Sequence, residues 1–167
     1  MRAALAILLL LGLAACGTSR QTEVPGVVRP QVAEPVSCVP YARERSGIRI
    51  AGDAWTWWDG AAGRYARSRT PRQGSVLVID RTRGMPDGHV AVVTRRVSNR
   101  EILVDHANWA SGAARGRIAT EQRVVDVSAR NDWSSVRVWY PRIDALGGTA
   151  FPVRGFVHAE AVTLAAR

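Results

Sequence analysis

After Pro71 the chain carries a series of short strand-like segments, and their spacing constrains the fold more than any other feature. Each segment is rich in Val, Ile or aromatic residues and is bounded by Gly, Pro, Asn or Asp. The predicted strands are 75–80, 90–97, 102–106, 124–127, 136–140 and 153–158. The connections between them are too short for parallel crossovers, so a mostly antiparallel sheet is expected.

Two helical segments are expected before this sheet. Ser37 can cap a short helix that continues through Ser46, and Gly47 can end it. A second helical stretch is expected from about Asp53 to Arg67. Helices followed by strands predict an α+β fold, in which the N-terminal helices pack on one face of the sheet.

The first residues predict an export signal. Met1 and Arg2 precede an apolar block, 3–13, that is followed by Ala14-Ala15-Cys16. This block is shorter than the roughly 20 residues of a membrane-spanning helix, so residues 1–15 are expected to be a signal peptide. Cys16 after Leu-Ala-Ala resembles the lipobox of bacterial lipoproteins, which implies that Cys16 carries a diacylglycerol anchor. The alternative is an ordinary signal cut that leaves Cys16 as a plain thiol.

The rest of the chain divides into a tether and one domain. Residues 16–35 contain three prolines and no helical or strand period, which indicates a flexible tether. The chain has 167 residues, 47% of them hydrophobic, which suffices for one compact domain. That domain is expected over 36–167, and no pattern indicates an oligomeric state.

Only two cysteines are present, Cys16 and Cys38. If Cys16 is lipidated, Cys38 is an unpaired thiol in an exported protein, where disulfides are otherwise favoured. Two alternatives stay open: that Cys38 is a buried inert thiol, and that Cys38 forms a disulfide with Cys16.

The charge of the chain favours anionic partners. All 23 basic residues are arginines, and removal of Arg2 with the signal leaves 22 against 14 acidic residues, a net charge of +8. Outside the cytoplasm such a charge favours wall polymers or lipid headgroups over nucleic acid. No Cys-x-x-Cys or His-x-x-x-His spacing occurs, so neither a metal site nor a cofactor is predicted.

Two residues have the chemistry for amide hydrolysis. This reaction needs a thiolate beside an imidazole, a third group that orients the ring, and donors for the oxyanion. Cys38 falls in the first turn of its predicted helix, where the helix dipole is expected to lower the thiol pKa below about 8.5. His89 follows Gly88 at the start of a predicted strand, where its imidazole can reach a neighbouring helix.

Candidates for the third group lie on the next predicted strand. Because side chains alternate along a strand, His106 and Asn108 share a face and can converge on the His89 ring. Asp105 points the other way and could serve only if a bulge turned the strand. Trp109 is expected either to stack on substrate or to cover the sheet edge.

Five sequence blocks resemble one enzyme family when taken in order. They are Cys38 at a helix start, Gly52-Asp53-Ala54 with Trp57, Pro71-Arg72-Gln73-Gly74-Ser75-Val76, Gly88-His89-Val90-Ala91, and His106-Ala107-Asn108-Trp109. This series resembles the CHAP domain (cysteine, histidine-dependent amidohydrolase/peptidase), related to papain-like and NlpC-type hydrolases. The resemblance implies a papain-like fold and metal-free cleavage of peptidoglycan amides, with Cys38 as nucleophile and His89 as base.

The sequence departs from this family at one position. CHAP members often carry Glu where this chain has His106, and a neutral imidazole stabilises a charged partner ring less than a carboxylate does. The expected enzyme is an amidase or endopeptidase, lipid-anchored in the bacterial envelope and facing the periplasm from the outer membrane. The scissile bond is either the muramoyl amide or a peptide cross-link. The alternative is an inactive CHAP-like lipoprotein that binds wall or partner proteins.

Overall fold

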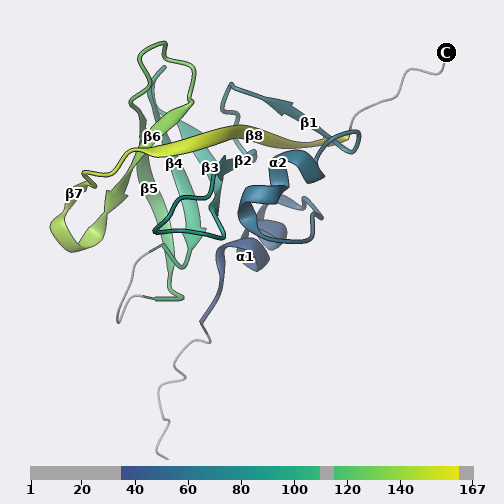
Figure 1. The fold of residues 1–167 in the computed structure, drawn as a ribbon, viewed down its shortest axis with the longest axis horizontal. Coiled ribbons are helices and arrows are strands. Elements are labelled where there is room, and N and C mark those ends of the chain that lie inside the picture. Colours follow the sequence, from purple (N-terminus) through teal and green to yellow (C-terminus); the bar gives the residue numbers. More distant parts are fainter. Residues whose placement is uncertain (1–34, 110–114, 162–167) are drawn as a thin grey trace, which may run out of the picture. The chain divides into compact units, whose positions relative to one another are not determined.

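The computed structural model describes residues 35–109 and 115–161 (Figure 1). The expected signal peptide, the lipidation site Cys16 and nearly all of the tether lie outside the described residues. Within the described ranges no helix is both long enough and apolar enough to cross a bilayer.

Antiparallel strands make up most of the described fold. The strands are β1 (Tyr65–Ser68), β2 (Val76–Ile79), β3 (His89–Arg96), β4 (Glu101–Ala107), β5 (Ile118–Asp126), β6 (Ser135–Tyr140), β7 (Ala145–Leu146) and β8 (Phe151–Ala161). Strands β2 to β6 and β8 correspond to the six predicted ones. The predicted antiparallel sheet is therefore confirmed, and the short strands β1 and β7 were not predicted.

The sheet closes into a barrel, which the sequence did not predict. Its strand order is β1-β8-β2-β3-β4-β5-β6-β7, and β8 also pairs with β6. The start of β8 lies against Ser135 and Val136 of β6, while its later residues pair with β2 and β1. Figure 1 shows β8 crossing from the β6 side to the β1 side. A six-stranded antiparallel barrel results, formed by β8, β2, β3, β4, β5 and β6.

The first predicted helix is confirmed. Helix α1 (Cys38–Ser46) follows Ser37, although the Ser37 side chain makes no capping hydrogen bond. The helix ends at Gly47, which has a left-handed φ of 74° and donates its N–H to the carbonyl oxygen of Arg43. Glycine adopts this conformation without steric cost, so the sequence fixes this end of the helix.

The second predicted helix, Asp53 to Arg67, is confirmed only in its first half. The segment forms only the 3₁₀ turn η1 (Ala54–Thr56) and the short helix α2 (Trp57–Gly60), and then continues as strand β1. Gly60 and Gly63 weaken helix propensity here, and Gly63 has a left-handed φ of 72°. A further 3₁₀ turn, η3 (Pro141–Ile143), precedes β7. The expected papain-like α+β architecture is met only in part, because the fold is mostly β.

Two hydrophobic cores explain why β2 is buried on both faces. Leu77 and Ile79 point into the barrel together with Val93 of β3. Val76 and Val78 point outward and pack against residues of α1, η1 and α2, including Trp57, which is fully buried. The helices therefore cover only one stretch of the barrel's outer wall. This packing fixes the start of α1 beside the start of β3, where the site lies.

Candidate active site

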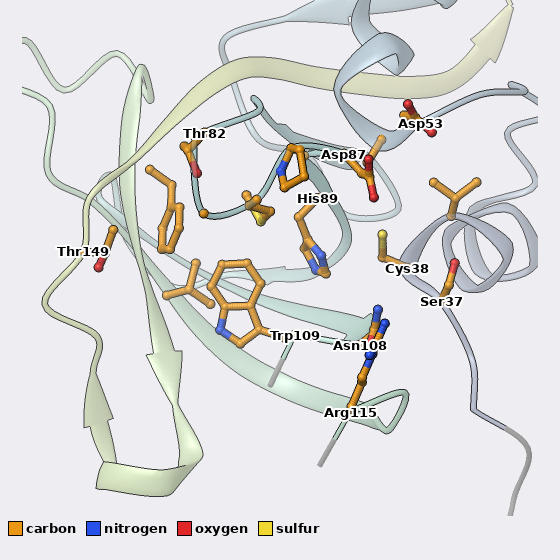
Figure 2. Close-up of a pocket in the computed structure, with 18 of the residues that line it drawn as sticks. Ser37, Cys38, Asp53, Thr82, Asp87, His89, Asn108, Trp109, Arg115 and Thr149 are labelled. Carbon is orange, nitrogen blue, oxygen red and sulfur yellow. The ribbon is translucent and has the colours of Figure 1, made fainter. Parts of the chain in front are cut away.

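A cavity of about 1220 Å³ opens beside the start of α1 and the start of β3. Cys38, His89, Asn108 and Trp109 all line it, and Figure 2 shows these side chains around the same space. They come from the first residue of α1, the first residue of β3 and the segment that follows β4. The fold thus gathers four of the residues singled out in the sequence around one cavity.

His89 and His106 form a buried pair. The Nε2 atom of His89 lies 3.1 Å from the Nδ1 atom of His106, within hydrogen-bond distance. The two residues are 3% and 1% exposed. Burial lowers the pKa of His89 well below 6.5, and the neighbouring His106 lowers it further. Burial also lowers the pKa of His106, to about 4, although the charge of Asp105 opposes this shift.

The pairing assigns different tasks to the two nitrogens of His89. Both rings are neutral at pH 7 because of their low pKa values. If His89 Nε2 carries the proton and donates it to His106 Nδ1, then His89 Nδ1 is left with a free lone pair. Among the described residues no hydrogen bond to His89 Nδ1 is found. This nitrogen is therefore available to accept a proton in the cavity.

Gly88 holds the chain in the conformation that delivers His89. Its φ is 66°, and an added Cβ would come within 2.8 Å of the Ile79 carbonyl oxygen and of the Trp55 backbone nitrogen. The same Trp55 N–H donates to the Asp87 carbonyl oxygen at 3.2 Å. A side chain at position 88 would meet backbone atoms that cannot move away cheaply. This crowding explains why glycine precedes His89 in the chain.

The pKa of the Cys38 thiol is raised, which corrects the expectation of a lowered value. Burial of the sulfur is the largest cause. The nearby backbone N–H groups of Val90, Val39 and Cys38 itself lower the pKa, but they do not outweigh burial. Desolvation disfavours the thiolate more than the start of this nine-residue helix favours it. Cys38 is therefore a protonated thiol at neutral pH.

Cys38 lies close to the start of β3 without a direct bond to the base. The sulfur lies near enough to the N–H of Val90, the residue after His89, for this group to lower the thiol pKa. Figure 2 shows the Cys38 side chain and the His89 ring facing the same space. Within residues 35–109 and 115–161, no hydrogen bond joins the two side chains. Catalytic hydrogen bonds are often long in the absence of substrate and tighten when it binds.

Asp105 faces away from the histidine pair. Its Oδ2 atom accepts from Arg45 at 3.0 Å, and its Oδ1 atom accepts from the Glu121 N–H at 2.9 Å. The β4–β5 register shifts between Val104 and His106, and Glu121 has a φ of 52°. The irregularity therefore lies on β5, opposite Asp105, and it gives this carboxylate a backbone partner. It does not turn Asp105 toward His89.

Asn108 lines the cavity, but its expected convergence on the His89 ring needs correction. Strand β4 ends at Ala107, and Asn108 has a left-handed φ of 59°, so the alternation of the strand stops before it. Its Oδ1 atom accepts from the Gly116 N–H at 2.9 Å. Among the described residues the orienting partner of His89 is His106 alone. The amide NH₂ group of Asn108 remains as a possible donor to substrate.

Trp109 covers the histidine pair from the cavity side. Its ring stacks on His106 with centroids 5.5 Å apart and meets His89 at 4.8 Å. It also packs edge-on against Phe151 at 5.1 Å. Trp109 is half-buried and lines the cavity, so shielding of the pair and contact with substrate are both compatible with its position.

Three charged cavity residues were not singled out as site residues in the sequence. Asp53, Asp87 and Arg115 all line the cavity and are exposed. Asp53 falls inside the Gly-Asp-Ala block, and Asp87 lies two residues before His89. Nothing in their local pattern distinguishes them from solvated surface residues. Within the described ranges no cluster of three or more His, Cys, Asp or Glu side chains could hold a metal ion.

Comparison with known families agrees with this geometry. Residues 30–108 match the family model of the CHAP domain. The chain contains a CHAP domain. The matched segment includes Cys38, His89, His106 and Asn108, and it ends one residue before Trp109. Neither a search of curated proteins nor a search of solved structures gives a match.

CHAP domains are in general hydrolytic amidases or peptidases, and peptidoglycan is the substrate associated with the family. The family match thus supports a peptidase-like fold for the segment that builds the cavity. Much of the barrel, from β5 to β8, lies beyond the matched residues.

Proposed function

We propose that this CHAP domain is a cysteine amidase or endopeptidase that cuts amide bonds of bacterial wall peptide. One observation carries the proposal. A cysteine at a helix start and a buried, oriented histidine face the same cavity, and both belong to the segment that matches the family. Cys38 is the proposed nucleophile and His89 the proposed base.

The proposed reaction begins with neutral groups. The Cys38 sulfur attacks the carbonyl carbon of the scissile amide while His89 Nδ1 takes the thiol proton. The protonated imidazole then gives this proton to the leaving amine, and a thioester with Cys38 remains. Water attacks the thioester carbonyl as His89 accepts its proton. The carboxylic acid leaves and the thiol is restored.

His106 supports this cycle by orienting the base. Its Nδ1 atom can accept the Nε2 proton of His89, which keeps the other nitrogen of that ring directed at the thiol. For the oxyanion, the proposed donors are the backbone N–H of Cys38 at the start of α1 and the NH₂ group of Asn108. Asn108 is held in place through its Oδ1 contact with Gly116.

A non-catalytic binding role is the second candidate. Two observations favour it: a neutral imidazole replaces the carboxylate common in the family, and the Cys38 thiol has a raised pKa. A domain of this kind would hold wall peptide in the same cavity without cutting it. The two candidates therefore differ in turnover and not in ligand.

Digestion of purified wall sacculi distinguishes the two candidates. The purified chain is expected to release soluble fragments, and their masses identify the scissile bond. Cys38→Ser and His89→Gln are each expected to abolish release while the thermal unfolding curve remains cooperative. His158→Gln is the matched control, because this buried histidine lies on β8 and bonds to Ser68, away from the cavity. Undiminished release by Cys38→Ser rules out the mechanism.

We further propose that the chain is anchored to the envelope through a lipid on Cys16. Only the sequence supports this, through the signal-like segment 1–15 and the lipobox-like residues before Cys16. Growth with a labelled fatty acid is expected to label the chain but not its Cys16→Ala variant. Equal labelling of both chains refutes the anchor without affecting the proposed hydrolysis.

A further inference from the structure

Two aspartates on the cavity wall have no salt-bridge partner among the described residues. Asp53 and Asp87 line the cavity, and Figure 2 shows Asp87 near the Cys38 sulfur and Asp53 farther away on the same side. Neither makes a salt bridge within the described residues, although the chain is rich in arginine. Five other aspartates do pair with arginine: Asp59, Asp80, Asp105, Asp126 and Asp132.

Asp53 occupies a helix N-cap position, where an aspartate side chain usually accepts a hydrogen bond from a backbone N–H two or three residues later. It is the N-cap of η1, yet its side chain makes no capping hydrogen bond. The carboxylate therefore remains free on the cavity side. Burial is the main cause of the raised pKa of the Cys38 thiol, and the negative charge of Asp87 adds a smaller contribution in the same direction. Its carboxylate makes no hydrogen bond among the residues described.

A second observation, independent of these two carboxylates, indicates ligand binding in the cavity. His89 is 3% exposed and lines the same space, and its Nδ1 atom has no hydrogen-bond partner among the described residues. An unpartnered polar atom that a largely buried side chain turns toward a cavity indicates where a ligand binds. The reacting part of a substrate therefore belongs between His89 and Cys38, within the reach of the two carboxylates.

One arginine of the cavity lies on the other side of the nucleophile. Arg115 and Arg43 both line the cavity, and Arg43 donates from Nε to the carbonyl oxygen of Ile50, which lies three residues before Asp53. In Figure 2, Arg115 lies beside Asn108, and Asp53 and Asp87 lie on the other side of Cys38. The two aspartates thus lie on the side of the sulfur that is away from Arg115.

We propose that Asp53 and Asp87 select substrates that carry a positively charged amino group next to the scissile amide. This inference rests on the proposed function and names the substrate class of the same site. Wall peptides offer two such groups, a free α-amino group and the side-chain amine of a diamino acid. Both present the same ammonium chemistry, so the experiment below separates them.

Such a substrate would also assist the nucleophile. An ammonium group beside Asp87 offsets the charge that disfavours the Cys38 thiolate, so proton transfer to His89 becomes easier once the substrate is bound. Substrates with this ammonium group are therefore expected to have both a higher kcat and a lower KM than substrates without it. A role confined to structure would not separate charged from uncharged substrates in this way.

Three versions of one peptide test the selection. A tripeptide amide of Ala, Glu and Lys with the stereochemistry of wall stem peptides is compared with the same peptide acetylated at the α-amine and with one acetylated at the lysine side chain. Loss of the recognised charge is expected to lower kcat/KM about tenfold. The acetylated peptide that shows this loss identifies which of the two amines the cavity recognises.

Matched variants assign the effect to the two aspartates. The double variant Asp53→Asn/Asp87→Asn is expected to treat the charged and acetylated peptides alike within about twofold, since isosteric amides keep the shape and remove the charge. Asp59→Asn is the control, because Asp59 pairs with Arg154 and does not line the cavity. Persistent discrimination by the double variant overturns the proposal.

Binding separates this inference from the proposed hydrolysis. The affinities of the three peptides are measured by calorimetry with the Cys38→Ser chain, which cannot form a thioester. If the wild-type chain cuts none of them but this variant binds the recognised charged form about tenfold more tightly, hydrolysis fails and ammonium selection stands. Equal affinities for all three peptides, or no measurable binding, overturn the selection.

Discussion

The Nε2 atom of His89 lies 3.1 Å from the Nδ1 atom of His106, and both rings are almost completely shielded from water. A neutral pair of this kind avoids the large desolvation cost of a buried carboxylate next to an imidazole. The carboxylate of Asp105, the residue before His106, bonds to Arg45 instead. The orienting group of the proposed base is therefore a second imidazole, and it holds the ring without placing a net charge beside it.

Removal of this orienting group is expected to impair catalysis. His106→Ala should lower kcat severalfold or more with little change in KM, because His89 would lose the acceptor that fixes its tautomer and ring angle. His106→Gln keeps an acceptor oxygen and should retain more activity than the alanine variant. Steady-state kinetics on a wall-peptide substrate provide the measurement.

Asp105→Asn is the companion variant for that experiment. It weakens the bond to Arg45 but leaves the His89–His106 contact intact. Its kcat is expected to stay near the wild-type value. If kcat fell in Asp105→Asn but not in His106→Ala, the orienting role would belong to Asp105, and its assignment to His106 would be wrong.

The buried histidines predict that the fold becomes less stable in acid. An unfolded histidine binds a proton below about pH 6.5, whereas folded His106 does so only near pH 4. The stabilisation is therefore complete above pH 6.5 and is lost as the pH falls from 6.5 to about 4. His106 contributes about 3 kcal/mol over this range, and His89 acts in the same direction.

Denaturant unfolding between pH 7.5 and 4.5 tests this linkage. Other groups also titrate in this range, so the informative quantity is the difference between the wild-type chain and His106→Gln. The variant should lose less stability on acidification than the wild-type chain does. Parallel pH profiles for the two chains would show that His106 is not buried as a neutral ring.

The Cys38 thiol is expected to react slowly in the free protein. Because burial raises its pKa, alkylation by iodoacetamide at pH 7.5 should be slower than that of a small model thiol. The rate should rise steeply only above about pH 9, as the thiolate forms. Mass spectrometry of the chain over time gives the rate, with Cys38→Ser to identify the modified residue. Rapid alkylation at neutral pH would indicate a preformed thiolate.

Gly88→Ala is expected to destabilise the fold and the site together. The new Cβ would overlap backbone atoms of Ile79 and Trp55 and would force a non-glycine residue into a left-handed conformation. We expect a cost of about 2 kcal/mol or more, seen as a fall of several degrees in Tm. Gly84→Ala is the matched control, since nothing lies within 4 Å of its added Cβ. Equal Tm values for the two variants would contradict this account.

The local elements and the chemistry-bearing residues could be predicted from the sequence. The six predicted strands follow from their composition and from their turn residues, and Gly47 marks the end of α1. The ordered blocks that include Cys38 and His89 were enough to indicate the family that the residues match. These features are local in the chain, so a linear pattern carries them.

The failed expectations share one cause, which is that they depend on contacts between distant segments. The stretch after Asp53 has the composition of a helix, yet pairing with β8 draws its end into a strand. Closure of the barrel likewise depends on β8 reaching β6. Asn108 leaves the strand face because its backbone turns at the end of β4 and its side chain bonds to Gly116.

The sequence by itself determined which residue types are available for the reaction and on which short elements they lie. The tertiary structure decided their ionisation and their neighbours. A helix start favours a Cys38 thiolate, but the packing of α1 on β3 buries the sulfur, and desolvation outweighs the helix. The charge of a group depends on the water and the atoms around it, and folding sets both.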